Sequence, residues 1–75
     1  MPLSPEQAAY LKAFGASVKR QRDRQRLTQE KLAELAGLNP RTVQKIEAGS
    51  VNILVTTVAR TRKALGCGWA ELMGK

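Results

Sequence analysis

The side chains of this sequence that could do chemistry are mainly cationic. Lysine and arginine number 13 against 6 aspartates and glutamates, which gives a formal net charge of +7 at pH 7. The sequence contains no histidine, and Cys67 is its single cysteine. These counts argue against most metal sites, histidine-based catalytic triads and an intramolecular disulfide. We expect no enzymatic activity, no metal and no cofactor, and a polyanionic partner, of which nucleic acid is the commonest.

The cations fall into two stretches of different character. Residues 19–26 alternate cations with Gln and Asp, a pattern that by itself is typical of a solvated helix face. We assign Arg24 and Arg26 to such a face. Around residues 40–48, helical spacing turns Val43, Ile46 and Glu47 inward. A polar, partly basic face then points outward, consisting of Arg41, Gln44, Lys45 and Ala48.

Residues 29–46 must position that basic face. Apolar residues recur at helical spacing over residues 32–36, and Gly37 follows where a left-handed cap would end a helix. Asn39 and Pro40 then begin a second helix, which runs to about Ala48 and is stopped by Gly49. Two short helices joined by a tight turn form a helix-turn-helix.

The flanking sequence predicts three further helices. Ser4, Pro5 and Gln7 form a capping box, so a helix should run from Pro5 to about Gln25, with a possible bend at Gly15. Another should span about Leu54 to Leu65, although β-branched residues precede and begin it. A last short helix, about Gly68 to Met73, should pack against the core or a second subunit. Its candidate contact residues are Trp69, Leu72 and Met73.

The spacing of Gln29, Ala33, Gly37, Val43 and Ile46 resembles that of the Xre/Cro-like family of phage lambda repressor-like DNA-binding domains. The resemblance extends over about residues 14–73. It implies an all-α, compact five-helix domain over residues 1–75, with residues 1–13 as a helical N-terminal extension and 28–48 as the helix-turn-helix. It also implies a transcriptional regulator that binds an inverted repeat of double-stranded DNA as a homodimer.

The resemblance assigns roles to individual residues. Base reading in the major groove is assigned to Arg41, Lys45 and Gln44, while Pro40 departs from the family's polar residue and offers apolar contact with a thymine methyl. Arg22 and Glu47 match a salt bridge that orients the recognition helix. In the first turn, Arg26 stands where the family often has glycine. The phosphate-contact candidates are Gln29, Thr28, Asn39, Lys19, Arg20, Ser50 and Asn52.

Two other functions compete with sequence-specific regulation. One is an antitoxin-like subunit that neutralises a toxin and binds an operator secondarily. The other is non-specific coating of nucleic acid, which would show salt-sensitive binding without sequence preference. We expect a cytoplasmic, nucleoid-associated protein with no membrane partner, since no apolar run approaches the ~18 residues of a membrane span and the first residues do not resemble a signal peptide.

Overall fold

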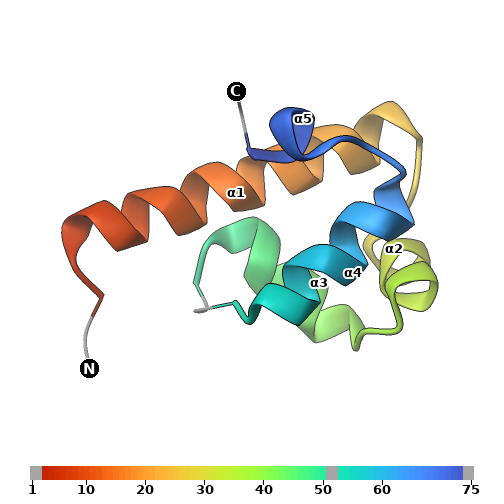
Figure 1. Ribbon diagram of the computed structural model, residues 1–75. Coiled ribbons are helices and arrows are strands. Elements are labelled where there is room, and N and C mark those ends of the chain that lie inside the picture. Colours follow the sequence, from red (N-terminus) through yellow and green to blue (C-terminus); the bar gives the residue numbers. More distant parts are fainter. Residues whose placement is uncertain (1–2, 51–52, 74–75) are drawn as a thin grey trace.

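Five helices and no strand make up residues 3–50 and 53–73, the part of the chain described by the computed structural model. In chain order they are α1 (Pro5–Arg24), α2 (Gln29–Ala36), α3 (Pro40–Ala48), α4 (Val55–Leu65) and α5 (Trp69–Met73). The long helix α1 crosses the domain, with α3 on one part of it and α5 on another (Figure 1). The predicted all-α, five-helix fold is confirmed, with helix ends within about one residue of those expected.

The helix starts follow the predicted caps. The Ser4 hydroxyl accepts from the Gln7 amide at 3.1 Å while the Gln7 side chain accepts from the Ser4 amide at 3.0 Å, which completes the capping box. Thr28 caps α2 through the amide of Lys31, and Asn39 caps α3 through the amide of Arg41. These bonds satisfy amides that have no partner within their own helix.

Gly15 lies within a continuous α1, so the helix is not interrupted there. The reason for a glycine is the neighbouring helix. A Cβ at this position would overlap the carbonyl oxygen of Ile46 and would lie 2.9 Å from that of Glu47. Gly15 therefore lets α1 approach the backbone of α3 more closely than any side chain would permit.

The core joins residues from all five helices and the loop before α5. Its fully buried apolar members include Val18, Leu32, Val43, Ile46 and Leu72. Three polar residues, Ser17, Gln21 and Thr61, are also buried. Thr61 can be buried on α4 because its hydroxyl donates to the Thr57 carbonyl at 2.8 Å and is thereby satisfied.

In the last helix, α5, the burial of Leu72 and Trp69 differs from what we expected. Leu72 is fully buried in the core, so in this fold it is not available to a second subunit. Trp69, which we expected to fill the core, is 48% exposed, and the Arg62 guanidinium lies 4.9 Å from its ring centroid. The side chain of Met73 lies outside the described part of the chain. Cys67 is a buried free thiol, and burial raises its pKa.

The backbone of Arg26 has a left-handed conformation, with φ 57°. This is the position where the Xre/Cro-like family often has glycine. A side chain destabilises this conformation by about 1–2 kcal/mol. Glycine avoids that cost, but it also raises the conformational entropy of the unfolded chain, which offsets part of the gain in stability. We therefore expect Arg26→Gly to raise the free energy of unfolding by about 1 kcal/mol in urea denaturation. Arg26→Ala is the control, because it removes the charge and keeps the Cβ. If alanine stabilises as much as glycine, charge and not backbone strain is responsible.

Candidate nucleic-acid interface

A three-residue connection sets α3 at an angle to α2. Gly37 ends α2 in the left-handed conformation, with φ 69°. The amide of Leu38 then donates back to the Ala33 carbonyl at 2.8 Å, and Asn39 caps the next helix. This hydrogen bond closes the end of α2 and fixes the direction in which the chain leaves it.

Helix α3 has one buried face and one exposed face. Val43 and Ile46 are buried between α1 and α2. Arg41, Gln44 and Lys45 are exposed, as is Pro40 at the start of the helix. The residues predicted to read bases therefore share the solvent side of one helix, where their donors and acceptors could meet base edges.

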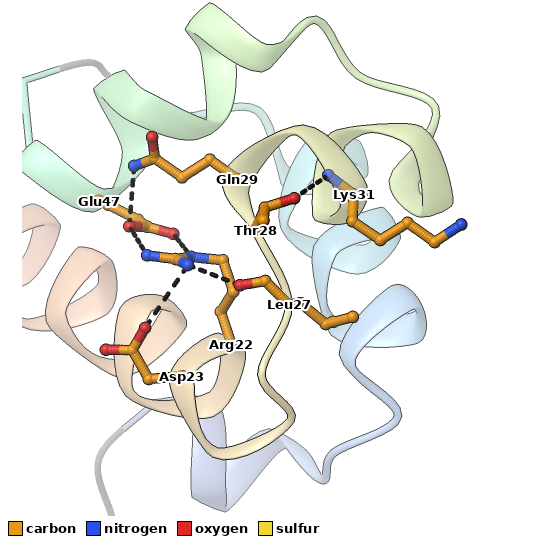
Figure 2. Close-up of polar contacts among 7 residues, drawn as sticks. All are labelled: Arg22, Asp23, Leu27, Thr28, Gln29, Lys31 and Glu47. Carbon is orange, nitrogen blue, oxygen red and sulfur yellow. Dashed lines mark hydrogen bonds and ion pairs between the residues drawn. The ribbon is translucent and has the colours of Figure 1, made fainter.

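An ion pair braces the end of α3 (Figure 2). The Arg22 Nε donates to Glu47 Oε2 at 2.7 Å, and its Nη2 donates to Oε1 at 3.1 Å, which makes the pair bidentate. The two side chains are only 12% and 5% exposed. Hydrogen bonding to Glu47 raises the pKa of Arg22, against burial that lowers it. The predicted salt bridge is thus present and largely removed from solvent.

Two further contacts extend this pair into a network. The Arg22 Nη1 donates to the Leu27 carbonyl at 2.7 Å, so the same guanidinium also holds the turn between α1 and α2. Gln29, at the first turn of α2, donates from Nε2 to Glu47 Oε1 at 3.1 Å. Sequence reasoning did not anticipate either contact. Together they join α1, the start of α2 and the end of α3 around one carboxylate (Figure 2).

The Gln29 contact changes how this residue could bind phosphate. Its amide nitrogen carries two hydrogens, of which one is directed to Glu47. The second can still donate to a phosphate in front of the α2 N-terminus, where the helix dipole also favours an anion. Gln29 therefore remains a predicted phosphate ligand, and its hydrogen bond to Glu47 holds the side chain in position.

The other predicted phosphate ligands differ in how free their side chains are. Lys19 is exposed, while the exposed Arg20 donates from Nη2 to the Ser17 hydroxyl at 3.0 Å. Thr28 and Asn39 use their side-chain oxygens as caps. The Ser50 hydroxyl donates to the Lys45 carbonyl at 3.3 Å, and Asn52 lies outside the described residues. A phosphate accepts from donors that face solvent, which Lys19 and Arg20 provide. Because the caps use oxygen atoms as acceptors, the Thr28 hydroxyl and the side-chain amide nitrogen of Asn39 also remain as exposed donors.

Within residues 3–50 and 53–73, no group of three or more His, Cys, Asp or Glu side chains is arranged to hold a metal ion. None of the helices in the same residues has both the length and the apolar character needed to cross a membrane.

Comparison with known proteins identifies the family. The helix-turn-helix family model matches residues 18–72. The chain belongs to this family. Within the family, its sequence resembles the Xre or lambda repressor-like members. It is similar to the crystal structure of the restriction–modification controller protein C.AhdI from Aeromonas hydrophila, with a TM-score of 0.81 and 33% identity. The similarity covers 85% of this chain and 97% of C.AhdI. No curated protein matches the chain.

Membership of this family establishes the general function of the chain as a DNA-binding transcriptional regulator.

Proposed function

We propose that the helix-turn-helix regulator binds an inverted-repeat operator as a homodimer, with α3 in the major groove of each half-site. The observation that carries the proposal is the exposed row of Arg41, Gln44 and Lys45 on a helix whose opposite face is buried. A helix held in this way can present side chains to base edges in a fixed register. The net charge of +7 supplies the sequence-independent attraction to phosphates.

The side chains on α3 differ in what they can recognise. Arg41 can bind the O6 and N7 of a guanine with two parallel hydrogen bonds, whereas Lys45 offers a single ammonium to the same acceptors. Gln44 can pair with adenine or reach a phosphate, and Pro40 can contact a thymine methyl. Gln29, Lys19 and Arg20 hold phosphates in this proposal and so set register without reading sequence.

A pair of exposed apolar residues at the start of α4 supports the proposed dimer. Leu54 is 71% exposed and Val55 is 80% exposed, and both follow the loop after α3. Covering them with a second copy would remove apolar surface from water and bring the two recognition helices into proximity. Trp69 remains a further candidate for the interface, whereas Leu72 does not.

The antitoxin-like alternative uses the same exposed apolar pair for a different partner. A toxin seated on Leu54 and Val55 would compete with self-association, so the free chain would be monomeric. The similarity to a restriction–modification controller favours regulation as the main task of this compact chain. Enrichment of an inverted repeat by the chain alone would support the homodimer, and enrichment of no duplex would favour the antitoxin-like role.

Two substitutions separate base reading from phosphate binding. Arg41→Ala should weaken binding to the preferred duplex by about 1–3 kcal/mol and relax the preference at one base pair per half-site. Gln29→Ala should weaken binding to preferred and scrambled duplexes alike, since phosphates carry no sequence information. Fluorescence anisotropy on both duplexes at one salt concentration measures this. Equal losses on every duplex for Arg41→Ala would remove Arg41 from the residues that read bases.

A further inference from the structure

A groove lies between α2 and α4, which pack against each other (Figure 1). It encloses about 630 Å³. Its lining residues are Leu35, Ala36, Gly37, Arg60, Lys63 and Ala64. No residue of α3 lines the groove, so an occupant would leave the predicted base-reading face uncovered.

The groove combines apolar surface with two cations, and none of its lining residues is acidic. Leu35 is 51% exposed although it lies among the periodic apolar residues of α2, and alanines from both helices flank it. Arg60 and Lys63 are exposed one helical turn apart on α4, and within the described residues neither forms an ion pair. The sequence of α4 contains three cations and no acid.

We infer that the α2–α4 groove docks an acidic, amphipathic helix of a partner protein. An apolar side chain of that helix would pack on Leu35 between the two alanines. Carboxylates one turn apart would pair with Arg60 and Lys63, matching the spacing of these cations along α4.

The apolar floor distinguishes this occupant from a nucleic acid. A phosphate backbone is bound by cations and hydrogen-bond donors, and a half-exposed leucine has neither a charge nor a donor for it. The exposed surface of α1 provides the contrast: a hollow of about 530 Å³ there is lined by Ala16, Lys19, Arg20, Asp23 and Arg24. That hollow has cations but also a carboxylate, and no large apolar side chain, so it serves as an internal control.

The probe is a synthetic helical peptide of about 15 residues with leucine on one face and glutamate beside it. Titrated into the isotopically labelled protein without DNA, it should shift the NMR signals of residues 35–37 and 60–64. Arg60→Ala with Lys63→Ala should weaken binding by about fivefold or more. Leu35→Ala, at a half-exposed site, should weaken peptide binding to a similar degree. The NMR spectrum of this variant should still be that of a folded protein.

The control protein carries Lys19→Ala with Arg24→Ala, which remove the same charge from the α1 hollow. Peptide binding should change less than about twofold in this control. Equal weakening in both double variants would overturn the inference, because attraction would then follow net charge alone. A peptide with lysine in place of glutamate should not bind. Shifts at the groove on adding a short DNA duplex, with displacement of the peptide, would instead assign the surface to nucleic acid.

Discussion

Replacing Glu47 by alanine should destabilise the fold by about 3–5 kcal/mol, because it leaves the largely buried guanidinium of Arg22 with only the exposed carboxylate of Asp23, 3.5 Å from its Nη1. A domain of this size has only about 4–11 kcal/mol of total stability, so the loss would be a large share of it. Glu47→Gln should lie between the wild type and Glu47→Ala, since an amide keeps the shape and one acceptor. Urea denaturation followed by circular dichroism gives the values.

Two controls test whether burial is the cause. Combining Arg22→Met with Glu47→Met removes both charges and should recover more than half of the loss caused by Glu47→Ala. The exposed pair between Lys31 and Glu34 provides the matched surface case, at 3.6 Å. Glu34→Ala should change stability by less than about 1 kcal/mol. A similar loss from Glu34→Ala and Glu47→Ala would contradict the role given to the buried network.

Replacing Gly15 by alanine should also destabilise the fold, against the ordinary preference of helices for alanine. Helix propensity alone predicts a gain of about 1 kcal/mol. The added Cβ, however, would overlap the carbonyl oxygen of Ile46, and a backbone atom cannot rotate away as a side chain can. We expect a net loss of about 2 kcal/mol or more, together with weaker operator binding because α3 must shift.

The neighbouring exposed position supplies the control for Gly15. Ala16 lies on the solvent side of the same helix, so Ala16→Gly should cost about 1 kcal/mol through propensity alone. Thermal or urea unfolding of both variants compares the two positions directly. A stabilised Gly15→Ala protein would contradict the close approach of α1 to the backbone of α3.

Helix termini were predictable because their signals are local. Ser4, Thr28 and Asn39 each bond an amide two or three residues away, and Gly37 and Gly49 end their helices with positive φ. Such preferences depend on the backbone geometry of a few neighbouring residues, which a short sequence window contains. The helix-turn-helix was predictable for the same reason.

Features that depend on the meeting of distant segments were harder to predict. The close approach at Gly15 depends on the backbone of α3, some thirty residues later in the chain. The bond from Gln29 to Glu47 joins residues 18 positions apart, and the sequence offered only a phosphate role for Gln29. In the 5-residue helix α5, no periodic stripe distinguishes an inward Leu72 from an outward Trp69.

The most direct test of the proposed function is selection of bound duplexes from a random DNA library at about physiological salt, where non-specific phosphate binding is weakened. We expect enrichment of an inverted repeat with half-sites about one helical turn apart, set by the two copies of α3. Enrichment of a lone half-site would contradict the dimer. Failure to enrich any sequence, from protein shown to be folded, would contradict sequence-specific regulation by this chain acting alone.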